Sequence, residues 1–454
     1  MQTIRRAFVA PIAMIGIMAI TNSGAAAQTP GYTILYSFQG GEDGSGPSGV
    51  TLARDGGLYG ATSYGGPNTC EGAAFSCGTV YELEPGPGGI WTKTVLHNFS
   101  GPDGAVPNLS GGVVGAPGPS LLPGPGGVLY GTTYTGGAYD PTALGPAGTV
   151  FELTPPTAAG QEWTETVLHS FPENGPNIPS GRLLLGSEGA IYGTTLSSGE
   201  EPVVGAIFGG TVFRLLPPVT PQGNWTERNL INFYPATSLG TSPEASVVRS
   251  SGSLFGTNYW TSSQHGGEGC GVAYQLSAPA TGDTWTGTAI YAFGDGPGCN
   301  PAASLTVGPN GVFYGTTYGG GTGRAGTVFQ LTPPSTAGGA WSETTIYNFT
   351  GPNGDGAYPA ASLVLGSNGV LYGSTSAGGN PSSCFGGGCG IVYELSPPAT
   401  PGGTWTETIL HAFTGQNGDG SFPGPLTLAP KGVLFGPTWS GGAAGAGTVF
   451  ALRP

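Results

Sequence analysis

Charged side chains are scarce in this chain of 454 residues. There are 11 Lys and Arg and 25 Asp and Glu, together 8% of the residues, whereas soluble domains have about 25%. The net charge of −14 offers none of the basic patches that bind phosphate backbones. Nucleic acid is therefore excluded as a partner class. Solubility must rest on Ser, Thr, Asn and exposed backbone.

Long hydrophobic runs are absent beyond the N-terminus. There, Arg5 and Arg6 precede the apolar run Ala7–Ile20, and Ala25–Ala27 supplies small residues before Gln28. This pattern predicts a signal peptide over residues 1–27 and a mature chain over 28–454. A membrane anchor is the alternative, but the run is shorter than the ~18 residues that a span needs. We expect an exported protein, extracellular, cell-surface or periplasmic, with no transmembrane span after processing.

Catalytic motifs are also lacking. His97, His169 and His411 share one repeated position that holds Tyr or Ile in other copies, so we interpret it as a packing position, and His265 lies alone in a loop. Gly321–Gly326 matches the dinucleotide fingerprint, but a strand rather than the required helix follows it. No Walker A, H-E-x-x-H or G-x-S-x-G motif occurs. The sequence predicts no catalytic residue, no metal and no cofactor.

Glycine and proline are abundant instead, with 89 and 42 residues, and they recur with a period. Gly311–Pro334 reads as two strands, Val312–Thr317 and Thr327–Thr332, joined by a glycine-rich loop. The first strand recurs with an aromatic-glycine step at Tyr59-Gly60, Tyr130-Gly131, Tyr192-Gly193, Phe255-Gly256, Tyr314-Gly315, Tyr372-Gly373 and Phe435-Gly436. The second recurs with a central aromatic at Tyr81, Phe151, Phe213, Tyr274, Phe329, Tyr393 and Phe450. A slot that stays aromatic in all seven copies predicts one core position per unit.

Two more strands complete each unit. We name the four strands a to d: a is upstream, as in Ser304–Val307, b and c are the pair above, and d is downstream, as in Trp405–Phe413. Strand a connects to b through Asp55-Gly56, Asn310-Gly311 or Asn368-Gly369, pairs in which both residues can take positive φ in a tight hairpin. Each unit is therefore a four-stranded antiparallel meander.

The two ends of the chain complement each other. The mature chain starts with a strand d, 32–38, and stops after a strand c, Thr448–Leu452. Pairing of these ends predicts an all-β, seven-bladed β-propeller closed by its N-terminal strand. The alternative, an open β-solenoid, needs atypical polar capping repeats, whereas these terminal repeats are typical.

Strand parity places the b–c and d–a loops on one side of such a propeller, here called the loop face. Loop length varies mostly there, so we expect binding on that face.

Six cysteines in an exported chain indicate disulfides, and of fifteen possible pairings locality favours Cys70 with Cys77, Cys270 with Cys299, and Cys384 with Cys389.

Two sets of residues on the loop face are candidate ligand contacts. Carboxylates recur in the d–a loops as Asp43, Asp103, Asp295, Asp355 and Asp419. Two of these loops, Asn353–Gly356 and Asn417–Gly420, resemble calcium loops without the closing Glu, and a plain Asp-Gly turn is the alternative. Aromatics recur where strand b enters its loop, as Tyr64, Tyr134, Tyr259, Trp260, Tyr318 and Trp439. They suit stacking on sugar rings or a protein partner, or else pack beneath the loops.

The repeat SLVLGSNGVLYGSTSAGG…GIVYELSP…WTETILHAFTG (residues 362–415) resembles the GloVer tandem-repeat proteins, which are exported bacterial proteins. The resemblance covers 32–454 and implies a propeller-like repeat array, with no catalytic residue to transfer. We therefore expect a monomeric binding or interaction module for polysaccharide or another envelope component. The alternatives are a carbohydrate lyase or hydrolase that uses loop carboxylates, and a purely structural surface protein.

Overall fold

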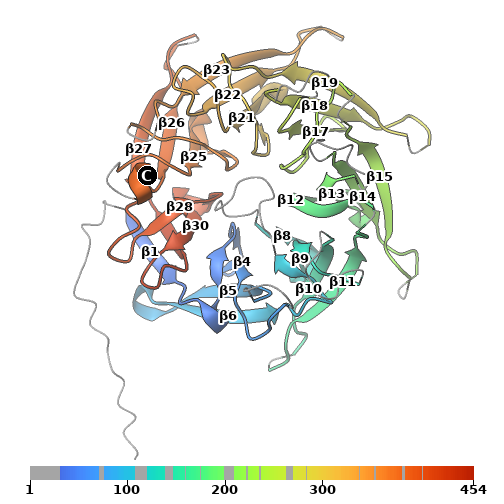
Figure 1. Ribbon diagram of the computed structural model, residues 1–454, viewed down its shortest axis with the longest axis vertical. Helices are drawn as coiled ribbons and strands as arrows, with labels where there is room; N and C mark the ends of the chain where they lie inside the picture. The colour runs from blue at the N-terminus through green and yellow to red at the C-terminus, as the bar shows by residue number, and fades with distance from the viewer. Residues whose placement is uncertain are drawn as a thin grey trace, which may run out of the picture.

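Seven antiparallel sheets surround a central axis in the computed structural model (Figure 1). The structure describes residues 31–70, 76–107, 120–138, 147–158, 160–173, 175–198, 209–220, 223–234, 237–261, 269–282, 284–336, 338–351, 354–380, 384–400 and 402–454. The predicted signal peptide and His265 lie outside these ranges. The arrangement confirms the seven-bladed propeller. Across the described ranges, no helix is both long and apolar enough to cross a membrane.

Strands b and c form the middle of every blade, and blades 1 to 7 are numbered in the chain order of their b strands. The b strands are β4 (Leu58–Tyr64), β9 (Leu129–Thr135), β13 (Ile191–Ser197), β17 (Ser253–Asn258), β21 (Phe313–Thr317), β25 (Leu371–Thr375) and β30 (Leu434–Gly441). The c strands are β5 (Thr79–Pro85), β10 (Thr149–Thr154), β14 (Thr211–Leu216), β18 (Val272–Ser277), β22 (Thr327–Thr332), β26 (Ile391–Ser396) and β31 (Thr448–Leu452).

The aromatic-glycine step exists because its glycine makes room for the aromatic of strand c. Gly315 pairs with Phe329, and a Cβ on Gly315 would lie 2.4 Å from Phe329 Cζ. Real Cβ contacts do not come this close, so any other residue here would displace a fully buried ring. The same pairing recurs in all seven blades.

Strand d is outermost and strand a innermost (Figure 1). The d strands are β6 (Trp91–Asn98), β11 (Thr164–Ser170), β15 (Thr226–Asn232), β19 (Thr286–Ala292), β23 (Ser342–Asn348), β27 (Thr406–Ala412) and β1 (Tyr32–Ser37). The a strands are β12 (Asn177–Leu185), β16 (Val248–Ser250), β20 (Thr306–Val307), β24 (Val364–Leu365) and the split strands β2/β3 (Ser45–Pro47, Thr51–Leu52), β7/β8 (Ala105–Pro107, Leu122–Pro123) and β28/β29 (Gly420–Pro423, Thr427–Leu428).

The ring closes through the two ends of the chain, as predicted. Strand β1 pairs antiparallel with β31, from Tyr32 opposite Leu452 to Ser37 opposite Thr448. The Arg453 amide adds a hydrogen bond to the Gly31 carbonyl at 3.0 Å. Figure 1 accordingly shows the first strand inside the blade that contains the last strands of the chain.

The a–b turns follow the expected conformation in two of the three named cases. Asn310 and Gly311 have φ of 56° and 77°, and Asn368 and Gly369 have 58° and 80°. The prediction is wrong for Asp55, because only Gly56 has positive φ there, at 95°. The Asp55 carboxylate instead accepts a hydrogen bond from the Gly57 amide at 3.1 Å, so a side chain rather than the backbone of Asp55 stabilises this turn.

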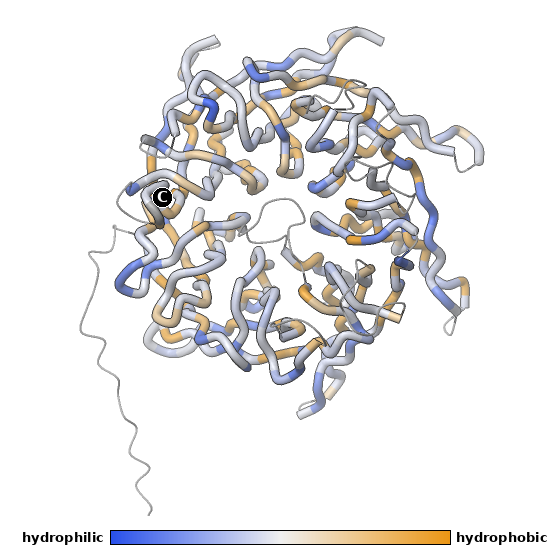
Figure 2. The backbone as a smooth tube through the Cα atoms, viewed as in Figure 1, coloured by the Kyte–Doolittle hydropathy of each residue, from blue (hydrophilic) through white to orange (hydrophobic). Residues whose placement is uncertain are grey.

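Each blade packs on the next through one repeated aromatic contact. A phenylalanine at the end of strand d meets the strand-c aromatic of the following blade, with ring centroids 4.9–5.4 Å apart. The pairs are Phe38–Tyr81, Phe99–Phe151, Phe171–Phe213, Phe233–Tyr274, Phe293–Phe329, Phe349–Tyr393 and Phe413–Phe450. Figure 2 shows apolar stretches along the blade strands and hydrophilic stretches at the outer edge.

A second repeated contact joins the blades on the loop face. In every blade a residue of positive φ followed by proline lies within strand a or a few residues ahead of it, as in Tyr358-Pro359 ahead of β24, where φ of Tyr358 is 60°. The Tyr358 amide donates to the Ala325 carbonyl of the preceding blade at 2.8 Å. Pro359 Cδ sits against Gly326, where a Cβ would approach to 2.6 Å. The residue before the proline is Gly46, Val106, Ile178, Ser242, Asn300, Tyr358 or Phe422.

Candidate functional site

The carboxylates of the d–a loops are bound by strand d and by their own loops. Asp419 Oδ1 accepts a hydrogen bond at 2.9 Å from the Tyr32 hydroxyl of the next blade. From its own strand d and loop, His411 Nε2 lies 3.4 Å from Oδ1 and the Thr414 amide donates to Oδ2 at 2.8 Å. The corresponding partners are Tyr36 and Gln39 for Asp43, His97 and Ser100 for Asp103, and Tyr347 and Thr350 for Asp355. These four carboxylates therefore hold their loops closed. Calcium binding stays a prediction.

Asp295, the fifth carboxylate, is exposed. Its backbone carbonyl accepts the Gly321 amide at 2.8 Å, which ties the d–a loop to the b–c loop. Asp295 lies beside the Cys270–Cys299 disulfide, and the three side chains come within 4.8 Å of one another. Disulfide sulfurs offer no thiolate to a metal. This group is therefore not a metal site.

The three cysteine pairs are those that locality favoured. Cys70–Cys77 and Cys384–Cys389 each close a b–c loop, with sequence separations of 7 and 5. Cys270–Cys299 joins a b–c loop to the next d–a loop across a separation of 29.

The strand-d position that holds three histidines is structural, as expected, but its role is not packing alone. His97 Nε2 bonds to Asp103 at 2.9 Å, and His411 Nε2 lies 3.4 Å from Asp419. His169 Nε2 lies 3.3 Å from Glu227 of the next blade. Each residue at this position faces one residue of the next blade's strand d, and these facing pairs are Tyr36–Lys93, His97–Glu165, His169–Glu227, Ile231–Gly287, Tyr291–Glu343, Tyr347–Glu407 and His411–Tyr32.

The junction between blades 1 and 2 brings two carboxylates together. Asp103 and Glu165 oxygens lie within 4.8 Å of each other and of His97. Burial raises the pKa of Glu165 to about 7, with His97 opposing the rise and Asp103 adding to it. Burial also acts to raise the pKa of Asp103, but hydrogen bonds from His97 and Ser100 outweigh it and leave that pKa below its ordinary value. Opposed pKa shifts in a close pair are typical of glycosidase carboxylates. The position of Glu165 recurs in the other junctions as Glu227, Glu343 and Glu407, and as Lys93, Gly287 or Tyr32, so the geometry favours a structural role.

The six predicted aromatics lie half-buried on the loop face. The Tyr64 and Trp439 rings meet edge to face, with centroids 6.0 Å apart. Tyr318 stacks on Tyr358 of the next blade at 4.9 Å, and Tyr259 contacts Trp260 at 4.8 Å. Tyr134 lies near this set, since its pKa is raised by burial, then by Tyr64 and by Glu244.

Positive φ explains how these contacts cross between blades. At Tyr358 the reversed backbone directs the side chain away from its own sheet and onto Tyr318. Gly46 takes the same position in blade 1, and a Cβ there would lie 3.1 Å from Trp439 Cζ3. Sequence reasoning missed Tyr358. The sequence does mark the position of Tyr358, because a proline directly follows the corresponding residue in every blade.

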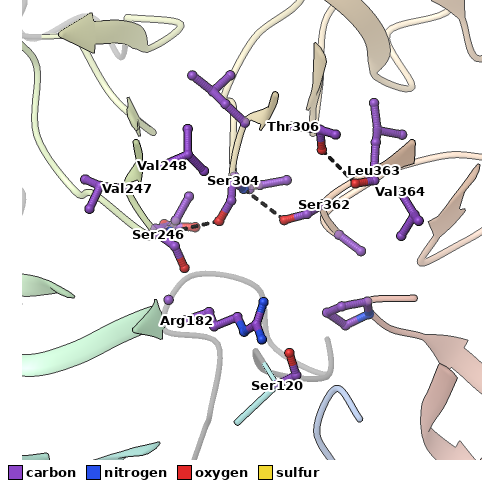
Figure 3. Close-up of a pocket in the computed structure, with 18 of the residues that line it drawn as sticks. Ser120, Arg182, Ser246, Val247, Val248, Ser304, Thr306, Ser362, Leu363 and Val364 are labelled. Carbon is purple, nitrogen blue, oxygen red and sulfur yellow. Dashed lines mark hydrogen bonds between the residues drawn. The ribbon is translucent and has the colours of Figure 1, made fainter. Parts of the chain in front are cut away.

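A cavity of about 450 Å³ lies on the central axis, lined by the first strands of the blades (Figure 3). Alanines and serines form much of its wall. The Ser246 amide donates to Ser304 Oγ at 2.9 Å, and the Ser304 amide donates to Ser362 Oγ at 3.1 Å. These hydrogen bonds join blades 4, 5 and 6 along the wall. Because the Ser304 and Ser362 hydroxyls act as acceptors in them, the proton of each hydroxyl is still available for donation.

Arg182 and Glu244 are the charged members of the described cavity lining. Figure 3 shows the Arg182 side chain extending into the cavity near Ser120, and its guanidinium lies 3.5 Å from the Leu121 carbonyl. Burial lowers the pKa of Arg182 and raises that of Glu244 to about 8. Glu244 Oε2 is buried and has no hydrogen-bond partner in the part of the chain that the structure describes.

Sequence reasoning missed both residues, although the repeats could have revealed them. The strand-a position of Arg182 holds Ser120, Ser246, Ser304 and Ser362 in other blades. The position after the strand-a proline holds Ser180, Ala302 and Ala360 in blades 3, 5 and 6, and Glu244 in blade 4. Each charge thus replaces a small residue of the repeat.

Among solved structures, the chain resembles a fungal alcohol oxidase of the AA5 family in complex with copper. The identity is 15%, the match covers 93% of this chain and 76% of that chain, and the TM-score is 0.50. A gluconolactonase from Xanthomonas campestris matches at 11% identity over 75% of this chain and 85% of that chain, with a TM-score of 0.36. The likeness to the alcohol oxidase shows the fold alone. No curated protein matches the sequence.

A family model matches residues 69–260, 115–386 and 256–454. Together these overlapping matches cover residues 69–454. The chain belongs to the family of the Gloeobacter/Verrucomicrobia repeat.

Proposed function

We propose that this propeller is an exported binding module whose loop face takes polysaccharide or another component of the cell envelope. One observation carries the proposal: half-exposed aromatic side chains gather on that face from several blades, as Tyr64 with Trp439 and Tyr318 with Tyr358. Aromatic faces held rigidly by neighbouring blades suit stacking on sugar rings, because little side-chain entropy is lost on binding. Three disulfides support an oxidising compartment, and we expect a monomer there.

The test is binding of the purified mature chain to a panel of envelope polysaccharides. The double variant Tyr318→Ala with Trp439→Ala should lose most of the binding, because each ring removed takes away a large apolar contact, and stacking contacts of aromatic rings contribute about 1 kcal/mol beyond burial. Trp163→Ala is the matched control, since this half-buried Trp lies at the start of strand d, on the opposite face, and packs on Tyr59. Wild-type binding by the double variant would remove the aromatic face from the proposal.

Glycoside hydrolysis is the second candidate function, favoured by the opposed pKa shifts of Asp103 and Glu165. A retaining hydrolase needs its two carboxyl groups about 5–5.5 Å apart, close to the spacing here. Release of reducing sugar that disappears in Asp103→Asn and in Glu165→Gln, with folding retained, would support this candidate. A purely structural surface protein, the third possibility, predicts no binding to any polysaccharide in the panel.

A further inference from the structure

The central cavity departs from the repeat at two points, where Arg182 and Glu244 bring ionisable side chains to its wall. Arg182 is exposed to the cavity, whereas the Glu244 carboxyl has a buried oxygen without a partner among the described residues, which costs stability. Small residues fill the same positions in other blades, as Ser304 and Ala302 do in blade 5. Two departures from the repeat in the neighbouring blades 3 and 4, both at the cavity wall, indicate a functional site.

The groups on the cavity wall are mostly hydrogen-bond donors. Arg182 is open to solvent within the cavity and presents a planar fork of N–H groups. Ser304 and Ser362 accept backbone amides, so their O–H groups remain to donate. Ser246 Oγ is buried and has no partner among the described residues. Such a wall fits a ligand rich in acceptors.

We propose that this cavity binds a small sugar acid, whose carboxylate pairs with the Arg182 guanidinium and whose ring hydroxyls bond to Glu244 and the serines. A guanidinium binds a carboxylate through two parallel hydrogen bonds. A volume of about 450 Å³ is within the usual range of small-molecule pockets, about 300–1,000 Å³.

The other charges favour a carboxylate over a more highly charged anion. The chain carries a net charge of −14, and Glu244 is the nearest ionisable group of the wall to compete for the ligand. Burial keeps Glu244 largely protonated near neutral pH, since its pKa is about 8. It then donates a hydrogen bond to a sugar hydroxyl instead of repelling the carboxylate. Tyr134 of the loop face lies near Glu244, but Tyr318 and Trp439 are not part of the cavity lining, and the inference stands without the proposed function.

The experiment is calorimetric titration of the mature chain with glucuronate and galacturonate, with glucose, methyl glucuronate ester and inorganic phosphate as comparison ligands. Sugar acids should bind, and glucose and the ester should bind at least about tenfold more weakly, because they lack the charge-assisted pair. Equal binding of the ester, tighter binding of phosphate, or no binding of either acid overturns the proposal.

The repeats themselves supply the variants. Arg182→Ser and Glu244→Ala restore the residues that other blades carry, so both should fold with an unchanged or higher Tm while binding weakens at least about tenfold. Arg54→Gln, at an exposed arginine outside the cavity lining, should bind as the wild type does. Retained binding by Arg182→Ser, or a lower Tm for both cavity variants, shows that the two charges belong to the scaffold. The loop-face double variant should keep its affinity for sugar acids, which separates this result from the polysaccharide test.

Discussion

At the scale of single residues, the strand-d position of the histidines decides the chemistry of each blade junction. Where the position is His or Tyr, the facing residue of the next blade is polar, as with His169 and Glu227 at 3.3 Å. Where it is Ile231, the facing residue is Gly287, and a Cβ there would lie 3.3 Å from Ile231 Cδ1. The facing residues are thus matched, polar with polar in six of these pairs and apolar with apolar at Ile231–Gly287, because a buried polar group left without a partner is costly.

The carboxyl group of Glu165 should make the stability of the folded protein depend on pH. Its pKa is about 7 in the folded protein, against an ordinary value of 4.5. The folded state therefore holds the proton more tightly, and stability should fall as pH rises from about 4.5 to about 7. Glu165→Gln, which resembles the protonated acid, should match the wild type near pH 4.5 and exceed it near pH 8 by about 1 kcal/mol, after allowing for solvent screening.

Thermal unfolding of both proteins across pH 4.5–8 checks this expectation. Glu162→Gln, three residues earlier and exposed, is the control and should leave the pH profile unchanged. A Glu165→Gln profile parallel to that of the wild type would contradict the assignment.

At the scale of strands and loops, the joint between blades on the loop face depends on a glycine. Gly326 has φ of 95°, and a Cβ would lie 2.4 Å from the Thr317 carbonyl oxygen and 2.6 Å from Pro359 Cδ. Gly326→Ala should therefore destabilise the protein by roughly 3 kcal/mol or more, because both backbone strain and overlap oppose it. Gly338→Ala separates the two causes, since φ there is 78° but nothing lies within 4 Å. That control should cost about 1 kcal/mol, and equal losses in denaturant unfolding would show that overlap with the next blade is unimportant.

The disulfides differ in the length of chain that they close. Cys270–Cys299 spans 29 residues and Cys384–Cys389 spans 5. In the chain-entropy account, the longer loop gives about 1.4 kcal/mol more stability, because it restricts the unfolded chain more. Paired Cys→Ser variants compared by urea unfolding should rank in that order. The opposite ranking would mean that the short loop of blade 6 stabilises through folded-state contacts.

The sequence was sufficient to predict the strands, their order and the disulfide pairs, because each rests on a local pattern repeated seven times. Gly315 and Phe329, for example, occur in the same register in every unit. It did not predict contacts made across blade junctions, such as Tyr318 with Tyr358, because the repeated proline marks the position but the residue type there does not indicate a positive φ or the direction of the side chain. Arg182 and Glu244 were missed for a different reason: a pattern search weighs what recurs, whereas these two residues matter as exceptions.

At the scale of the whole molecule, one set of contacts continues through all seven junctions, including the one made by the N-terminal strand. Phe38 of β1 packs on Tyr81 with ring centroids 5.2 Å apart, as the other six phenylalanines do in their junctions. Tyr32 of the same strand stacks on His411 at 3.7 Å and donates to Asp419. Strand β1 therefore holds blades 6, 7 and 1 together without a covalent link.

Removal of this strand tests closure of the ring. A mature chain that starts at residue 39 loses the pairing with β31 and the contacts of Tyr32 and Phe38. The free edge of β31 should then promote self-association, and we expect Tm to fall by at least about 10 °C because two junctions are broken at once. Light scattering and thermal unfolding measure the two effects.

Moving the strand to the other end of the chain tests whether the loss of stability comes from the open ring. Residues 31–39 appended after Pro454 through the c–d connector of blade 5, 333–341, would form strand d within its own blade, as in the other six blades. This rearranged chain should recover the monomer and most of the lost Tm, because every contact of β1 is available again while the chain ends move to the loop face. A truncated chain as stable as the mature one, or a rearranged chain no better than the truncated one, would show that pairing of β1 with β31 does not hold the ring together.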